Sequence, residues 1–165
     1  MKTFYDFHAS PVGNLLLAIN EGGLSHLHFD KGPGSLPIRP DWTHDSSRLD
    51  HVRAQVDAYF AGALQAFDLA LAPTGTDFQI AVWNELVRIP YGETTSYGAI
   101  ARTLGDITAS RAVGAANGQN PIAIIVPCHR VIGSTGKLVG YGGGLPTKRF
   151  LIDLEQRHRT FALVP

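Results

Sequence analysis

The segment that most restricts the fold of this chain is residues 122–132, where five apolar residues lead into Pro127 and Cys128. Proline fixes its own backbone φ and favours an extended conformation in the residue before it, so the chain approaches Cys128 with few alternative conformations. Cys128 is the only cysteine, and His129 and Arg130 follow it directly. Cationic neighbours lower a thiol pKa, which predicts a nucleophile; the alternative is a cysteine that fills the core, as many free cysteines do.

Composition and charge place the chain among small globular proteins. Its 165 residues are 44% hydrophobic and 17% charged, with no apolar run long enough to cross a bilayer. The start lacks the apolar stretch of a signal peptide and one cysteine cannot form an internal disulfide, so we expect a cytoplasmic protein. Residues 1–75 carry five basic and eight acidic side chains, whereas residues 76–165 carry nine and six. This asymmetry predicts an acidic scaffold joined to a mildly basic working domain.

The first part of the chain predicts a small antiparallel sheet. Short alternating or apolar runs are separated by turn residues, which is typical of a three-stranded meander; they cover residues 3–9, 15–20 and 24–29. His26 and His28 share one face of the third strand, but no third metal ligand is apparent, so zinc is the weaker interpretation. We therefore expect no metal site.

A loop, a helix and one more strand are expected before the linker. Residues 30–46 are rich in Pro, Gly and Asp, apolar positions then recur at helical spacing from Leu49 to Phe60, and residues 67–71 alternate like a strand. Residues 72–75 have the composition of a linker. We accordingly predict one domain over 1–74 and a second over 75–165.

The second domain is predicted to be mostly helical. Thr76 is placed to cap a helix whose apolar stripe comprises Phe78, Val82, Leu86 and Ile89. Two short helices over 96–104 and 109–117, joined by a turn, then have the outline of a helix-turn-helix.

The second helix of that pair carries mostly small side chains, Ala, Gly and Ser, with one long cation, Arg111. Small side chains permit close approach to a DNA groove, where a single arginine can enter the base stack. They equally permit close packing between helices, with Arg111 as a solvated charge. The segment alone leaves both interpretations open.

The residues around Cys128 closely resemble the active-site motif of the O6-alkylguanine-DNA alkyltransferases, also called methylated-DNA–protein-cysteine methyltransferases. The resemblance covers residues 75–157 almost continuously and in order: Gly75–Gln79, Val82–Trp83, Ile89–Thr94, Ser96–Gly98, Arg111–Gly114, Asn120–Pro121, Pro127–Val131 and Gly140–Leu145. It implies an α+β protein in which a ribonuclease H-like domain precedes a winged helix-turn-helix domain.

The resemblance also implies a chemistry. An alkylated base would be flipped out of the duplex, and the Cys128 thiolate would take the alkyl group irreversibly, without a cofactor. His129 would accept the thiol proton through a water molecule, and Glu155 would orient the imidazole. Tyr97 would donate a proton or hydrogen bond to the base, and Asn120 would brace the active-site turn.

Two further groups of residues come from the same resemblance. Arg111 would fill the gap left by the flipped base, with DNA contacts from Tyr97, Ser110 and Ala112. The substrate pocket would be formed by Val131, Val139, Tyr141 and Gly142.

The expected partner is double-stranded DNA containing alkylated bases, bound by a monomer that can assemble cooperatively on DNA and needs no other protein. The chain lacks the cysteines that ligate zinc in some relatives, and it has Gly142 where a serine is common. Two alternatives remain at this point, a protein that binds lesions without transfer and a cysteine hydrolase that uses Cys128 and His129.

Overall fold

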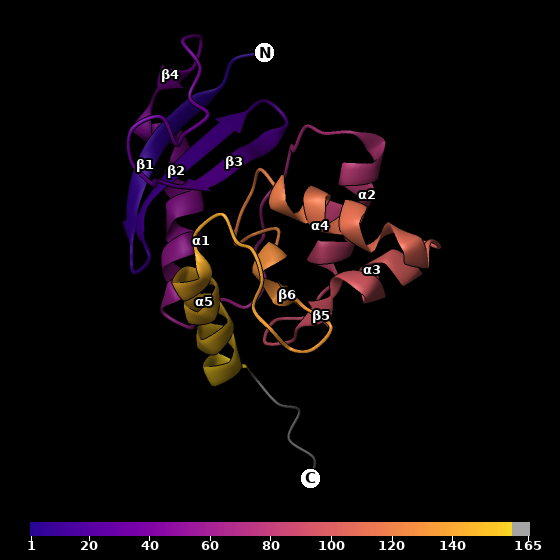
Figure 1. Cartoon of the computed structure of the whole chain (residues 1–165). Coiled ribbons are helices and arrows are strands. Elements are labelled where there is room, and N and C mark those ends of the chain that lie inside the picture. Colours follow the sequence, from indigo (N-terminus) through magenta and orange to yellow (C-terminus); the bar gives the residue numbers. More distant parts are fainter. Residues whose placement is uncertain (160–165) are drawn as a thin grey trace.

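The first part of the chain forms a sheet with strand order β3-β2-β1-β4 in the computed structural model, which describes residues 1–159 (Figure 1). Strands β1 (Phe4–Ser10), β2 (Gly13–Asn20) and β3 (Gly23–Phe29) form the predicted antiparallel meander. The expected loop over 30–46 contains a short strand, β4 (Thr43–His44), which pairs in parallel with β1. The sheet is therefore four-stranded and mixed.

A 3₁₀ turn, η1 (Ser46–Leu49), leads into helix α1 (Asp50–Phe60). The predicted helical face is confirmed, because Leu49, Val52, Val56 and Tyr59 are fully buried. Gly62 follows the helix with a φ of 75°, a left-handed conformation that glycine adopts without steric cost. This is the predicted C-terminal stop.

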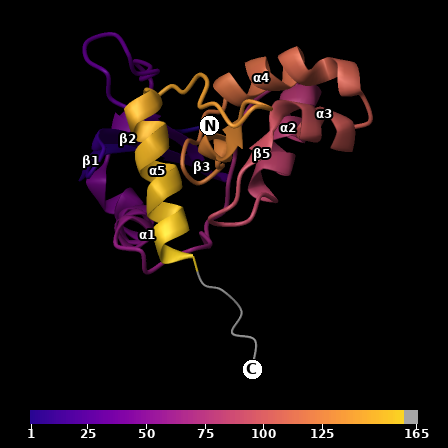
Figure 2. The same cartoon turned by 60° about the horizontal axis from the view of Figure 1, so that its bottom comes forward.

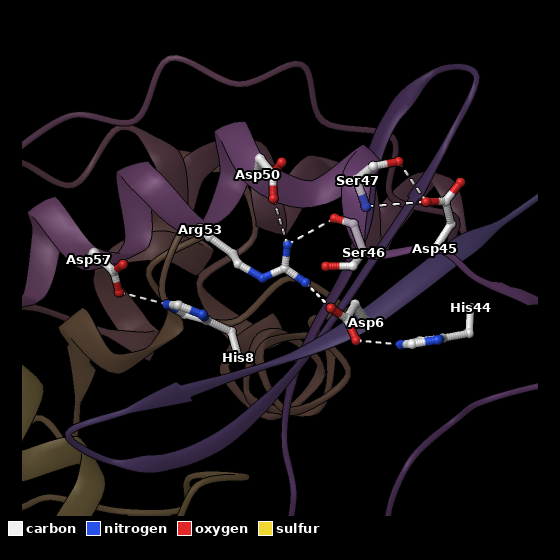
Figure 3. A network of polar contacts seen from close by, with 9 residues as sticks. All are labelled: Asp6, His8, His44, Asp45, Ser46, Ser47, Asp50, Arg53 and Asp57. Carbon is white, nitrogen blue, oxygen red and sulfur yellow. Dashed lines mark hydrogen bonds and ion pairs between the residues drawn. The ribbon is translucent and has the colours of Figure 1, made fainter.

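A polar network joins α1 to the sheet (Figure 3). Asp6 of β1 accepts hydrogen bonds from Arg53 of α1 and His44 of β4, and His8 of β1 contacts Asp57 of α1 at 2.6 Å. Burial raises the pKa of Asp6, but its hydrogen bonds, led by the one to His44, outweigh burial and lower it. The network fixes α1 against β1.

The strand predicted over residues 67–71 is wrong. The segment runs alongside β3, with hydrogen bonds from Leu24 N to Ala70 O (2.9 Å) and from Ala72 N to Leu24 O (2.7 Å), but only an isolated bridge links Leu24 and Leu71. Pro73 follows immediately and has no N–H with which to continue a ladder.

The second part begins with α2 (Asp77–Val87). Thr76 and Gln79 form a reciprocal capping box at its N-terminus, as the sequence predicts for Thr76. Val82 and Leu86 of the predicted stripe are buried, but Phe78 is 39% exposed, because the buried face begins one turn later than the pattern suggests.

The helix-turn-helix is confirmed. Helix α3 (Tyr97–Thr103) is capped by the Ser96 side chain, and a 3₁₀ turn, η2 (Ile107–Ala109), connects it to α4 (Ser110–Gly118). Beside it, β5 (Thr95–Ser96) pairs in parallel with β6 (Val131–Ile132).

The last helix, α5 (Leu145–His158), lies beside α1 in both views (Figures 1 and 2). Its Phe150 ring is 6.4 Å from that of Phe60, so a helix late in the sequence packs on the first part of the chain. One core of buried residues runs through both parts. Among residues 1–159, no helix combines the length and apolar character that crossing a bilayer requires.

Candidate functional site

The segment before Cys128 is held between the two parts of the chain. Leu27 of β3 donates its N–H to Pro121 O (2.9 Å) and accepts from Ala123 N (3.1 Å). The Asn120 amide bridges the same turn, since Nδ2 donates to Val126 O (2.8 Å) and Oδ1 accepts from Ile122 N (3.0 Å). The sheet and Asn120 together determine the course of this turn.

Ile124 within this turn has a φ of 71° and is 1% exposed. A β-branched residue in the left-handed region is a steric outlier, which persists only where the surrounding packing holds it. Such outliers cluster at functional sites, and this one lies four residues before Cys128.

Cys128 begins a single 3₁₀ turn, η3 (Cys128–Arg130), and faces a cavity of about 510 Å³ between the two parts of the chain. Cys128 is buried, with 6% of the residue exposed, and the Asn117 amide lies 3.5 Å from the Cys128 carbonyl. The cavity is lined from the first part by Leu27, His28, Phe29, Lys31 and Ser35, and from the second by Tyr97, Gly114, Asn117, Gly118, Asn120, Ala123, Cys128, Gly140, Tyr141 and Gly142.

The expectation that its neighbours lower the thiol pKa is wrong. Burial raises the pKa of Cys128, and this outweighs the opposing effects of the Asn120 amide and the Lys148 charge. Arg130 does not help, because its guanidinium turns away to the Ile89 carbonyl (Nη1, 2.6 Å) and to Glu155. The thiol therefore needs a base to remove its proton.

Glu155 of α5 forms hydrogen bonds with several polar groups behind the thiol. Its Oε2 lies 2.6 Å from His129 Nε2, and its Oε1 accepts from Arg130 Nε at 2.7 Å and from the Gly92 N–H at 3.3 Å. Tyr59 donates its hydroxyl to Oε2 at 2.6 Å. Burial raises the pKa of Glu155, but His129 and Arg130 outweigh burial and lower it to about 2. Glu155 is thus a buried carboxylate anion and not an exposed carboxylate on the surface of its helix.

His129 is fully buried, and only one of its ring nitrogens is paired. Nε2 faces Glu155, whereas Nδ1 has no hydrogen-bond partner among residues 1–159. Burial lowers the pKa of His129, and the hydrogen bond with Glu155 opposes this effect. A neutral imidazole held in this way has a free nitrogen with which to accept a proton.

Two tyrosines and a lysine lie around the thiol. The Tyr97 hydroxyl is 3.4 Å from Val139 O, and burial, together with the charge of Cys128, raises the pKa of Tyr97. Tyr141 has a pKa raised well above the usual range by the same two causes. Lys148 is fully buried and donates to Val139 O at 2.9 Å. Both phenols stay protonated at neutral pH and can donate.

The remaining predicted site residues do not line the cavity. Val131 is buried in β6, and the Val139 side chain is 39% exposed, so Val139 contributes its carbonyl to Tyr97 and Lys148. On α4, Ser110 is half-buried, and Arg111 and Ala112 are exposed.

The small residues Gly114 and Ala116 of α4 pack on other helices. A Cβ placed on Gly114 would come within 3.8 Å of the Tyr97 ring, and Ala116 O accepts the indole N–H of Trp83 at 2.9 Å. Arg111 lies on the outer side of the helix. Close helix packing and an outward arginine therefore coexist.

Several residues of this site could not be predicted from the sequence. Tyr59 was expected only as an apolar helix position, and Lys148 and Asn117 carried no local signal. The cavity wall supplied by β3 and the loop after it was missed because no motif there suggests contact with Cys128. The His26 and His28 rings lie side by side at a tilt of 31°, with centroids 5.5 Å apart, and no group of three or more metal-binding side chains occurs within residues 1–159.

A helix-turn-helix domain that carries a buried cysteine at a cavity shared with a small sheet domain defines a narrow class of proteins. The protein-family model described as "6-O-methylguanine DNA methyltransferase, DNA binding domain" matches residues 77–157, and the family model of the corresponding "ribonuclease-like domain" matches residues 3–73. The chain belongs to the 6-O-methylguanine DNA methyltransferase family.

Relatives match nearly the whole chain. A methylated-DNA–protein-cysteine methyltransferase of Methanosarcina barkeri is 54% identical over 94% of this chain and 98% of its own. The crystal structure of the Mycobacterium tuberculosis O6-methylguanine methyltransferase superimposes with a TM-score of 0.89 at 50% identity, covering 96% of this chain and 95% of that one. A crystal structure of Mycobacterium tuberculosis OGT in complex with DNA has a TM-score of 0.86 at 48% identity, covering 96% and 94%.

Proposed function

We propose that this protein repairs DNA by transferring an alkyl group from O6-alkylguanine, and from O4-alkylthymine, to Cys128. The observation that carries the proposal is the Cys128 thiol facing the cavity, with the His129–Glu155 pair buried behind it. Relatives of matching length are methylated-DNA–protein-cysteine methyltransferases, and the family includes a structure solved with DNA. The product thioether is stable, so each molecule acts once and needs no cofactor.

The chemical step is a single displacement. The Sγ atom of Cys128 attacks the alkyl carbon, the S–C bond forms, and the bond between that carbon and the base oxygen breaks. His129 takes the thiol proton through a water molecule at Nδ1, and Glu155 stabilises the imidazolium. Base assistance is required because burial raises the pKa of the thiol.

The electron pair of the broken bond stays on the base. Tyr97 donates a hydrogen bond or proton to the base as this charge develops; its raised pKa keeps the phenol protonated, so the hydrogen-bond donor is present at neutral pH. The Gly142 N–H is proposed to contact the lesion oxygen, and the carbonyls of Cys128 and Val131 to accept from the exocyclic amine. Tyr141 completes the proposed pocket, Val139 supports it through the carbonyl that contacts Tyr97 and Lys148, and Asn120 braces the turn.

The DNA contacts are proposed to come from α4. A base must leave the stack before Cys128 can reach its alkyl carbon, which costs unstacking energy. Arg111, exposed on α4, inserts into the gap, while Ser110, Ala112 and Tyr97 approach the backbone.

We propose duplex DNA containing alkylated bases as the partner, bound by a monomer in the cytoplasm that can assemble cooperatively on DNA and requires no other protein. The domain boundary is proposed between residues 74 and 75. The last six residues of the second domain, 160–165, lie outside the described residues.

Intact-mass spectrometry after mixing the protein with excess duplex carrying one O6-methylguanine tests the proposal. The expected result is a gain of one CH₂ group that maps to Cys128, one lesion lost per protein molecule and no further turnover. Cys128→Ala is expected to gain no mass while retaining duplex affinity. Retention on the lesion without a mass change would favour a binding protein, and lesion clearance by Cys128→Ala would refute transfer to this thiol.

A further inference from the structure

Tyr59 brings the first part of the chain into contact with the polar cluster behind the thiol, formed by His129, Arg130 and Glu155. It belongs to α1, and its hydroxyl lies 2.6 Å from Glu155 Oε2, although the two residues are 96 positions apart. The same oxygen is 2.6 Å from His129 Nε2. Tyr59 is fully buried and Glu155 is 1% exposed, so this contact is shielded from water.

The direction of this hydrogen bond is determined by the charges around it. Glu155 is ionised, since its pKa is lowered to about 2, and an ionised carboxylate only accepts. Burial and the charge of Glu155 raise the pKa of Tyr59 well above its usual value, so the phenol keeps its proton. Tyr59 therefore donates to Glu155.

The ring of Tyr59 is held independently of its hydroxyl. Its centroid lies 5.3 Å from Phe60, 5.5 Å from Phe67 and 6.3 Å from Tyr91. Helix α1 is itself fixed to β1 through Arg53 and Asp6 (Figure 3). The hydroxyl is thus presented to Glu155 by a packed ring on a helix that is joined to the sheet of the first domain.

We propose that Tyr59 is a positioning residue for alkyl transfer: its hydroxyl holds the Glu155 carboxylate so that Oε2 faces His129. This inference rests on the proposed function and extends it, because it makes the first domain part of the machinery that activates the thiol. Without the phenol, Glu155 retains Arg130 Nε and Gly92 on Oε1 and Arg130 Nη2 on Oε2 at 3.1 Å, while Oε2 loses its shorter donor and is held less firmly toward the imidazole.

The pH dependence of transfer should report this contact. The charged groups acting on His129 are Glu155 and Lys148 of α5 and its neighbour Arg130, and Tyr59 of α1 reaches it through Glu155. If Tyr59 holds Oε2 toward His129, its removal weakens the contact through which the Glu155 charge stabilises the imidazolium and so lowers the pKa of His129. The acid limb of the rate profile, where His129 becomes protonated, then moves to lower pH.

The test compares single-turnover transfer rates of the full-length protein and its Tyr59→Phe variant on a duplex with one O6-methylguanine, from about pH 5 to pH 9. Tyr59→Phe is expected to slow transfer about tenfold at neutral pH, the effect of losing one hydrogen bond to a buried charge, and to move the acid limb down by about half a unit.

Tyr91→Phe is the matched control. The Tyr91 hydroxyl is also buried but has no hydrogen-bond partner among residues 1–159, so its removal deletes the same atom from the same aromatic cluster without touching Glu155. The control should retain the wild-type rate and profile. A Tyr59→Phe protein that behaves like Tyr91→Phe would overturn the positioning role.

A second comparison separates positioning from general loosening. If Tyr59 acts through the carboxylate, Tyr59→Phe should change the rate by less than about twofold in a Glu155→Gln background. Equal slowing in both backgrounds would contradict the proposal. If the wild-type protein transfers no alkyl group, the proposed function itself fails; if it does transfer, a negative result for Tyr59→Phe refutes this inference alone.

Discussion

Replacing Glu155 with glutamine should destabilise the protein by an amount that depends on pH. The substitution keeps the shape of the side chain but removes the negative charge that faces Arg130 and His129. It leaves a buried guanidinium without its counter-ion, which is costly because the Arg130 side chain is only 9% exposed.

The magnitude follows from the pKa of Glu155, which falls from 4.5 to about 2 on folding. At about 1.4 kcal/mol for each pKa unit, the ionised carboxylate contributes about 3 kcal/mol to the free energy of unfolding. Because the folded-state pKa is the lower one, this contribution is complete above pH 4.5 and is lost as the pH falls toward 2.

Urea unfolding of wild type and Glu155→Gln at a series of pH values measures this difference. We expect a gap of about 3 kcal/mol at pH 7 that narrows steadily below about pH 4.5. Glu93→Gln is the control, since Glu93 is exposed, and should leave stability unchanged at every pH. A gap that stays constant from neutral to acid pH would show that lost packing, and not the charge, explains the destabilisation.

Two further predictions concern the cavity and α4. Gly142→Ser should leave the free energy of unfolding within about 0.5 kcal/mol of wild type, because a Cβ there meets no atom within 4 Å. Gly143→Ser should lower the free energy of unfolding by about 1–3 kcal/mol, because its Cβ would come within 3.0 Å of two aromatic rings. Urea unfolding of both variants tests this contrast, and equal stability would contradict it. Arg111→Ala should leave stability unchanged, since the side chain is exposed, but weaken binding to a lesion-containing duplex about tenfold by fluorescence anisotropy; unchanged affinity would remove Arg111 from the proposed DNA interface.

Features that depend on neighbouring residues were predictable from the sequence. The capping box at Thr76, the glycine stop at Gly62 and the antiparallel meander are set by hydrogen bonds and periodicities that span a few residues. The failures arose where local pattern and tertiary contact disagree. Residues 67–71 alternate like a strand yet make only one bridge, and Phe78 fits the apolar stripe yet remains exposed.

The sequence by itself determined that Cys128 would stand at the end of a stiff turn next to His129, because proline and the apolar run restrict the backbone locally. Only the tertiary structure decided the electrostatics of that site. Burial raises the thiol pKa, although the neighbouring His129 and Arg130 predicted a lower one. Arg130 pairs instead with Glu155, 25 residues away. Tyr59 reaches the same carboxylate from 96 residues away. Dielectric environment and long-range pairing depend on what packs around a residue, and spacing along the chain does not encode them.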